Sequence, residues 1–218
     1  MIRLYHVHKS FGENDALSDI NLRIAKGEFV YVTGPSGAGK STLLKLLYGA
    51  ERPTGGKLLV GGVDASKLSQ RQLPFLRRNV GVVFQDFKLI QRRTVLDNVG
   101  LALEVLGMPR QEIERRVRAV LGVVGLRGKE KRYPTQLSGG EQQRVAVARG
   151  IVNDPAILLA DEPTGNLDGA MAIEVMEILQ AINLRGTTVM VATHDVGLME
   201  RFPARRVRFE DGKLVRDR

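Results

Sequence analysis

The 218-residue sequence contains no cysteine, few aromatic residues and no long apolar run. Without cysteine, the chain can form neither a disulfide bond nor a thiolate metal site. No run of about 18 apolar residues occurs, so we expect no segment that spans a bilayer. Aromatic residues make up only 5% of the chain, and none lies among the basic clusters. This disfavours binding of single-stranded nucleic acid, which relies on base stacking against aromatic rings.

The sequence also lacks a linker, an internal repeat and a low-complexity segment. We therefore expect one domain, long enough to bury a sizeable core. The chain begins Met1-Ile2-Arg3, without the charged-then-apolar pattern of a signal peptide. That start suits the cytosol. If the protein works in a transporter-like complex, the membrane-spanning part of that complex would then be another polypeptide.

Residues 34–41 carry the strongest chemical signal. They read Gly-Pro-Ser-Gly-Ala-Gly-Lys-Ser and match the phosphate-binding pattern G-x-x-x-x-G-K-[ST] at every fixed position. Residues 29–33 predict a buried strand before this loop, and residues 41–47 predict an amphipathic helix after it. The alternative is a glycine-rich turn that happens to precede a helix. The strand and helix on either side favour the phosphate loop.

The loop predicts a nucleoside triphosphate site. Its glycines let successive N–H groups point into one concavity, and the start of the helix adds partial positive charge. Lys40 would reach the β- and γ-phosphates, and the Ser41 hydroxyl would ligate Mg²⁺. The expected nucleotide-binding residues are Gly34, Pro35, Ser36, Gly37, Ala38, Gly39, Lys40, Ser41 and Thr42.

A second apolar strand, in residues 155–163, ends in the adjacent carboxylates Asp161 and Glu162. The carboxyl end of a strand is where an α/β sheet binds its ligand. Asp161 is placed to hold the magnesium ion, directly or through water. Glu162 is placed to orient and deprotonate an attacking water. The alternative is an acidic turn that closes the strand before Pro163, and the phosphate loop upstream argues against it.

Residues 137–144 read Leu-Ser-Gly-Gly-Glu-Gln-Gln-Arg and stand directly before a helical segment. They resemble the LSGGQ signature that defines ABC-type ATPases, with Glu141 in place of its Gln. Ser138, Gly139 and Gly140 would expose N–H groups at a helix start, which makes a second anion cradle without a lysine. We expect Ser138, Gly139, Gly140 and Glu141 to contact nucleotide held by another subunit.

The family resemblance implies a fold and an assembly. The fold is α/β: a P-loop NTPase core with an antiparallel β subdomain and a helical subdomain. In this family, the signature of one subunit closes over the nucleotide held by the phosphate loop of the other. The resemblance therefore implies an Mg²⁺-dependent ATPase that works as a homodimer with two ATP molecules at its interface.

Four further residues match family motifs one at a time. Gln85 resembles the Q-loop glutamine that touches the metal, and His194 resembles the switch histidine that contacts the γ-phosphate. Asp168, in Asn-Leu-Asp, resembles the D-loop that crosses the dimer interface. Phe11 stands where the family, usually with Tyr, stacks an aromatic ring on adenine. Taken singly, each has an ordinary structural alternative. Order and spacing along the chain favour the motifs for Gln85 and His194.

We expect residues 1–218 to form a single ABC ATPase domain. Residues 1–90 and 150–218 would be the catalytic core with its β subdomain, and about 91–149 the helical subdomain that carries the signature. Helical periodicity covers residues 94–106 and 111–124. The antiparallel β subdomain is expected from residues 1–33 and about 57–64. His6 and His8, which alternate on the first strand, are interpreted as side chains of one strand face rather than metal ligands.

Thirty-three Lys and Arg against 24 Asp and Glu give a net charge of +9. This excess indicates an anionic partner, and both nucleic acid and an anionic membrane surface are candidates. The alternative is a set of scattered, solvated arginines without a common partner. The basic clusters are residues 77–78, 92–93, 115–118, 129–132 and 205–208. The low aromatic content disfavours nucleic acid as the partner.

Within the family, residues 48–56 and 78–90 are most similar to the bacterial cell-division branch. Gln85-Asp86-Phe87 carries much of that distinction. The resemblance implies FtsX, a polytopic membrane protein, as partner, and a peripheral location on the cytoplasmic face of the inner membrane. ATP hydrolysis would then control cell-wall hydrolases by mechanical signalling. The alternatives are the ATPase subunit of an exporter or lipoprotein-release system, and a soluble ABC ATPase that acts on nucleic acid.

Overall fold

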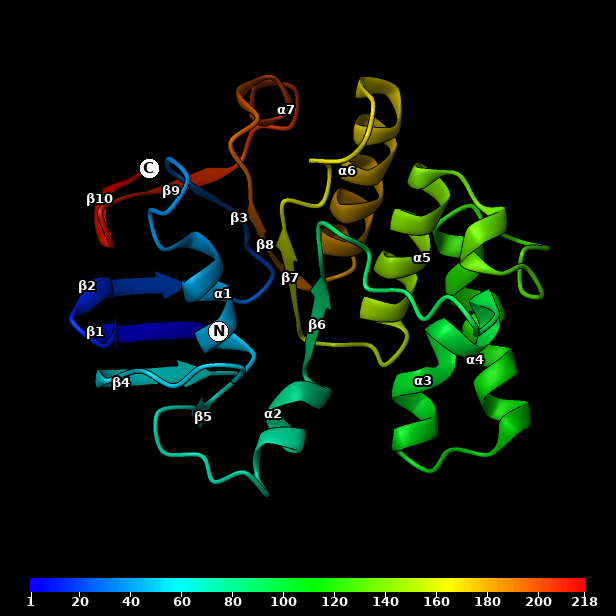
Figure 1. Cartoon of the computed structure of the whole chain (residues 1–218), viewed down its shortest axis with the longest axis horizontal. Helices are drawn as coiled ribbons and strands as arrows, with labels where there is room; N and C mark the ends of the chain where they lie inside the picture. Colours follow the sequence, from blue (N-terminus) through cyan, green and yellow to red (C-terminus); the bar gives the residue numbers. More distant parts are fainter.

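A computed structural model describes all 218 residues and shows two β-sheets with helices between and beside them (Figure 1). The strands are β1 (Ile2–Phe11), β2 (Asn14–Ile24), β3 (Phe29–Thr33), β4 (Gly55–Val60), β5 (Val63–Asp64), β6 (Val80–Val83), β7 (Ile157–Asp161), β8 (Thr188–Ala192), β9 (Arg205–Glu210) and β10 (Lys213–Asp217). The helices are α1 (Lys40–Leu47), α2 (Leu73–Arg78), α3 (Val95–Val105), α4 (Arg110–Val123), α5 (Gly139–Ile151), α6 (Gly169–Leu184) and α7 (Val196–Arg201), with a 3₁₀ turn at Pro134–Gln136.

The smaller sheet is antiparallel, with strand order β2-β1-β4-β5. Its strands alternate buried and exposed residues along much of their length, because one face packs on the core and the other faces solvent. The prediction that residues 1–33 all belong to this sheet is wrong for residues 29–33. Those residues form β3, which is buried on both faces and belongs to the other sheet.

The larger sheet has the order β10-β9-β3-β8-β7-β6, and only β10 runs antiparallel to its neighbour. Strands β3, β7 and β8 are short runs of mostly β-branched and aliphatic residues, as expected for parallel strands covered on both faces. The strands predicted in residues 29–33 and 155–163 are confirmed as β3 and β7. The phosphate loop follows β3, Gln85 follows β6, the acidic pair Asp161-Glu162 lies at the end of β7, and His194 follows β8. These residues therefore meet at the edge of the sheet formed by the carboxyl ends of its parallel strands.

Helix α1 lies between the two sheets (Figure 1). Its Leu43, Leu44, Leu46 and Leu47 are all buried, in a cluster of 27 residues that also includes side chains of β1, β2, β3 and β4. Burial on both sides removes apolar surface from water, and each Å² of apolar surface buried stabilises the fold by roughly 25 cal/mol. The helix that follows the phosphate loop is therefore fixed between two rigid layers.

The opposite face of the larger sheet packs on α5 and α6, and α3 and α4 lie beyond them (Figure 1). A second cluster of 30 buried residues runs without interruption from the sheet into α3 and α4. The helices predicted in residues 94–106 and 111–124 are confirmed as α3 and α4. Thr94 caps α3 by accepting a hydrogen bond from the Asp97 N–H. The subdomain boundaries at residues 90 and 150 stay a prediction.

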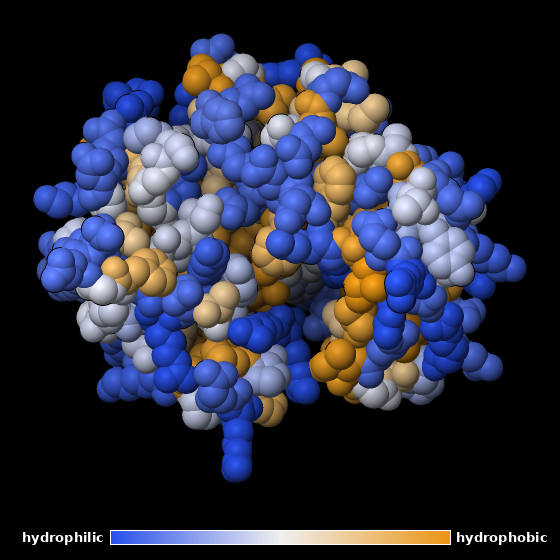
Figure 2. Space-filling view, in the orientation of Figure 1, coloured by the Kyte–Doolittle hydropathy of each residue, from blue (hydrophilic) through white to orange (hydrophobic).

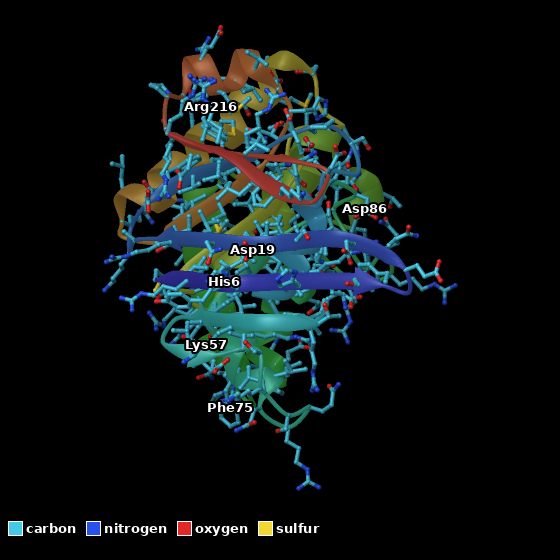
Figure 3. The ribbon with its side chains drawn as sticks, turned by 90° about the vertical axis from the view of Figure 1, so that its left-hand side faces the viewer. His6, Asp19, Lys57, Phe75, Asp86 and Arg216 are labelled. Carbon is cyan, nitrogen blue, oxygen red and sulfur yellow. The ribbon has the colours of Figure 1, made fainter.

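His6 and Asp19 lie side by side on β1 and β2 (Figure 3), with Nδ1 of His6 2.7 Å from a carboxylate oxygen of Asp19. Both residues adopt left-handed backbone conformations, at a place where the pairing of the two strands shifts register. His8 Nδ1 accepts a hydrogen bond from the Asp19 N–H at 3.3 Å. Both histidines therefore contact the neighbouring strand.

The longest helix, α6, has 16 residues. No helix combines the length and the apolar character that crossing a bilayer requires.

Candidate functional site

The phosphate loop connects β3 to α1, as predicted. Its glycines are required at two close approaches. A Cβ on Gly34 would lie 2.1 Å from the Phe209 carbonyl oxygen, and one on Gly39 would lie 2.6 Å from that of Ala16. Both glycines also have positive φ angles, of 140° and 99°, which other residues rarely adopt. Neighbouring backbone therefore fixes the curl of the loop from both sides.

Lys40 is the first residue of α1, and its side chain folds back over the loop. The ammonium donates hydrogen bonds to the carbonyl oxygens of Gly34 and Pro35, at 2.8 and 2.9 Å. These contacts place a full positive charge in the concavity of the loop. An anion bound there would meet the ammonium, the loop N–H groups and the positive end of the helix.

Ser41 and Asp161 meet although 120 positions separate them in sequence. The Ser41 hydroxyl donates to a carboxylate oxygen of Asp161 at 3.1 Å. Burial raises the pKa of the Asp161 carboxyl above its ordinary value, and the Ser41 hydrogen bond opposes that shift. A half-buried carboxylate and a hydroxyl this close are the oxygen donors that a Mg²⁺ ion prefers.

Glu162 and His194 form a second pair at the same edge of the sheet. His194 Nδ1 lies 2.9 Å from a carboxylate oxygen of Glu162, and the Glu162 N–H donates to the Ala192 carbonyl oxygen at 2.9 Å. Glu162 has a φ of 46°, in the left-handed region. That conformation costs a residue other than glycine about 1–2 kcal/mol, and the sheet edge holds it in place.

Gln85 contacts Asn166, which follows the acidic pair. The Asn166 amide donates to the Gln85 carbonyl oxygen at 3.0 Å, and the Gln85 amide lies 3.5 Å from Asn166 Oδ1. Gln85, Glu162 and His194 line one cavity of about 590 Å³ together with most of the phosphate loop. The structure thus brings together residues predicted from four separate segments.

One further residue that lines this cavity, Ala16 of β2, was not predicted. A small residue in a strand carries no chemical signal, and only the packing of β2 beside the loop reveals it.

Phe11 lies at the end of β1, 47% exposed, and its ring is covered by the Lys9 ammonium at 4.5 Å from the ring centroid. It is not among the residues that line the cavity.

The signature residues lie at the start of α5. Ser138 and Glu141 form a capping box: the Ser138 hydroxyl accepts from the Glu141 N–H, and the Glu141 carboxylate accepts from the Ser138 N–H. Hydrogen bonding to the Ser138 N–H holds the pKa of Glu141 below its ordinary value. Gly140 packs on α6, where an added Cβ would lie 2.5 Å from Met171 Sδ. None of the four signature residues lines the cavity of the phosphate loop in the same chain.

Asp168, the predicted D-loop residue, caps α6. Its carboxylate accepts a hydrogen bond from the Met171 N–H at 3.0 Å. The first turns of α5 and α6 therefore lie side by side, and Met171 contacts both Gly140 and Asp168.

Arg149, near the end of α5, holds the segment that follows Gln85. Its guanidinium donates to the carbonyl oxygens of Phe87 and Lys88, at 2.7 and 2.6 Å. Both of those residues have positive φ angles. Burial lowers the pKa of Arg149, which has no carboxylate partner. Nothing in the sequence distinguishes this arginine from its exposed neighbours.

The sequence profile of the ABC transporter family matches residues 17–165, which include the phosphate loop, the signature and the acidic pair. The chain belongs to the ABC transporter family. Its members are ATPases, so the chain is an ATP-binding and ATP-hydrolysing enzyme.

Relatives within the ABC transporter family match over the full chain. The chain is 50% identical to the cell division ATP-binding protein FtsE of Bacillus subtilis, covering 100% of this chain and 96% of that protein. It is 52% identical to FtsE of Mycobacterium tuberculosis, over 100% and 95% of the two chains. For FtsE of Escherichia coli K12 the identity is 49%, over 98% and 97%. The resemblance to the cell-division branch is confirmed.

Two solved structures of ABC cassettes share the fold. The dimeric cassette MJ0796 superposes with a TM-score of 0.91 at 39% identity, over 100% of this chain and 98% of that one. A dimeric post-hydrolysis state of the same cassette, bound to ADP and phosphate, gives a TM-score of 0.90 at 38% identity, with the same coverage. The predicted ABC nucleotide-binding fold is therefore confirmed.

Proposed function

We propose that this ABC ATPase acts in bacterial cell division and couples ATP-driven dimer closure to a polytopic membrane protein of the FtsX type. The coupled movement would regulate cell-wall hydrolysis on the other side of the membrane. The observation that carries this proposal is the identity of about one half, over nearly the whole length, to FtsE proteins of three distant bacteria. The ATPase would then lie peripherally at the cytoplasmic face of the membrane.

Each residue predicted for the site has a role in this proposal. Lys40 and the loop N–H groups, with Thr42, bind the phosphates of ATP, and Phe11 contacts the adenine. Glu162 orients and deprotonates the attacking water, and His194, held by the Glu162 carboxylate, contacts the γ-phosphate. Gln85 is the last group of the site. Its position would depend on whether ATP is bound, and the segment after it, which Arg149 holds, would move with it.

The oxygen donors near the phosphate loop fit a magnesium ion. Ser41 and Asp161 already lie within hydrogen-bond distance, and Gln85 lines the adjoining cavity. When bound, Mg²⁺ would neutralise charge on the β- and γ-phosphates. It would also offset the cost of keeping the half-buried Asp161 carboxylate ionised.

Two copies of the chain would complete each site. Within one copy the signature lies apart from the phosphate-loop cavity, so Ser138 to Glu141 are free to cover ATP on a partner. Asp168, on the neighbouring first turn of α6, would lie at the same interface. The dimeric MJ0796 cassette provides a precedent for such an assembly. Loss of the γ-phosphate contacts after hydrolysis would reopen the dimer.

This chain has a candidate docking groove for the membrane partner, between α3 and the segment formed by α2 and β6. A hollow flanked by apolar surface runs there (Figure 2), and a cavity of about 450 Å³ lies between α3 on one side and α2 with β6 on the other. Val105 at its rim is 79% exposed. Arg77, Arg78 and Arg149 line the same cavity. The groove therefore suits a partner segment that has an apolar face and acidic flanks.

Affinity capture from native membranes tests the proposal. Tagged Glu162→Gln protein with Mg-ATP should retain a membrane protein of the FtsX type, and Val105→Glu in the same background should lose it. Leu184→Glu is the matched control, because Leu184 is also exposed and apolar, at 87%, and lies at the end of α6 outside the groove. Absence of any FtsX-type protein would overturn the division role.

A second function shares every residue of the site. An ATPase subunit of an exporter or lipoprotein-release system would use the same cassette, and the likeness to the MJ0796 transporter cassette favours it. Capture of a permease with a transport cavity would establish this alternative. Recovery of nucleic acid without a membrane protein would contradict both functions.

A further inference from the structure

Four arginines gather on one face of the hairpin β9–β10. Arg206 and Arg208 are two residues apart on β9, so their side chains lie on the same face of the strand. The strand register pairs Arg208 directly with Arg216 of β10. Arg206 and Arg218 exchange both backbone hydrogen bonds, so they also lie opposite each other. The register shift between Leu214 and Arg216 brings these side chains to the same face. Figure 3 shows Arg216 on this hairpin.

This arrangement is unfavourable without a counter-charge. Like charges directly opposite on an antiparallel pair destabilise the sheet. Only Arg208 has a carboxylate partner on this face, Glu210 at 2.7 Å. Arg206 donates instead to the Met199 carbonyl oxygen, and Arg216 forms no ion pair. An anion bound between the two cross-strand arginine pairs would offset their repulsion and so stabilise the sheet.

The four arginines line a cavity of about 500 Å³ whose lining includes no Asp or Glu side chain. Gly34, Pro35 and His194 also line it, and the same three residues line the phosphate-loop cavity. The two spaces therefore meet along the first residues of the phosphate loop and the His194 side chain. Thr33 of β3 pairs with Arg208 of β9, which fixes the arginines beside the start of the loop.

We propose that this arginine pocket is a second anion site, which binds inorganic phosphate as it leaves the hydrolysis site. Guanidinium groups match the geometry of phosphate oxygens and bind them through charge-assisted hydrogen bonds. Orthophosphate produced beside His194 is next to a region of concentrated positive charge, and that field draws it away from the bound ADP. The pocket thereby separates the two products of the reaction.

Orthophosphate titration by calorimetry tests the pocket in a Lys40→Ala background, which weakens anion binding by the phosphate loop. The Lys40→Ala protein should still bind orthophosphate, and adding Arg208→Gln and Arg216→Gln should weaken that binding roughly tenfold or more. Adding Arg52→Gln and Arg71→Gln instead is the control. It removes the same charge at two arginines outside the cavity and should leave binding unchanged. Equal binding by the two triple variants would overturn the proposal.

The phosphate group could also belong to an anionic lipid. Cosedimentation with phosphatidylglycerol vesicles distinguishes this source. Vesicle binding that depends on Arg208 and Arg216, without orthophosphate binding, would overturn the assignment to the reaction product. Thermal unfolding shows that the variants remain folded: the Tm of the variant with Arg208→Gln and Arg216→Gln should equal or exceed that of the Lys40→Ala parent, because the two changes together remove the repulsive Arg208–Arg216 pair.

Discussion

Nδ1 of His194 lies 2.9 Å from a carboxylate oxygen of Glu162, and the two residues follow adjacent parallel strands. Because an ionised carboxylate only accepts hydrogen bonds, Nδ1 carries the proton in this contact. The imidazole is thereby oriented, and Nε2 is left free. One oxygen of Glu162 holds the ring and the other is available to a water molecule. In the proposed mechanism the pair would therefore combine the positioning of His194 with proton acceptance by Glu162.

Glu162→Gln should abolish most hydrolysis while keeping ATP bound. The amide preserves size and can still contact His194, but it cannot accept a proton from water. We expect kcat to fall about 100-fold or more, with ATP-dependent dimers that persist in gel filtration. A variant that hydrolyses ATP at the wild-type rate would remove Glu162 from the role of general base.

Asp161→Asn should stabilise the nucleotide-free protein and weaken its response to Mg-ATP. Burial raises the pKa of Asp161 above its ordinary value of 3.8. As pH rises above that value, the unfolded chain loses its proton first, so wild-type stability falls until the folded pKa is passed. The Tm advantage of Asp161→Asn should therefore grow across this window and stay constant above it. An advantage that is the same at every pH would contradict the burial argument.

Arg149→Met should loosen the segment after Gln85. The change keeps an apolar stem but leaves the carbonyl groups of Phe87 and Lys88 without their donor, at a cost of about 1–3 kcal/mol. Urea unfolding measures the loss, and hydrogen exchange should show faster opening in residues 86–90. Arg71→Met, at an exposed position, is the control. Unchanged stability would mean that the two hydrogen bonds contribute nothing.

Gly140→Ala and Gly139→Ala should differ although the two glycines are neighbours. A Cβ on Gly140 would lie 2.5 Å from Met171 Sδ, whereas one on Gly139 would meet only Leu167, at 3.8 Å. We expect Gly140→Ala to cost about 1–3 kcal/mol through overpacking, and Gly139→Ala to leave stability unchanged or slightly raised. Thermal unfolding of both variants measures the difference. Equal losses would show that Met171 moves aside freely.

Features that depend on short stretches of chain could be predicted from the sequence. The strands around Val30, Leu158 and Val191 are apolar runs bounded by turn residues, and each phosphate-site motif directly follows such a run. Assigning residues 29–33 to the antiparallel sheet failed because sheet membership depends on partner strands. Periodicity in one strand does not reveal which strands pair with it.

Other parts of the site depend on contacts between distant segments. Ala16 approaches the phosphate loop only because β2 packs beside it. Arg149 and Gln143 look like ordinary polar residues of a helix, yet one holds Phe87 and the other donates to the Pro163 carbonyl oxygen at 2.5 Å. The left-handed backbone conformation of Glu162 likewise could not be predicted, because the residue is not a glycine.

Helix α5 has a mechanical consequence for the whole cassette. Its first turn carries Ser138 and Gly140, Gln143 in its second turn holds the backbone just after Glu162, and Arg149 in its last turn holds the backbone just after Gln85. A rigid rod fixed at these points transmits displacement in either direction. A push from a membrane partner on the Gln85 segment would thus shift the signature surface, which we propose covers ATP on the opposite subunit, without any local unfolding.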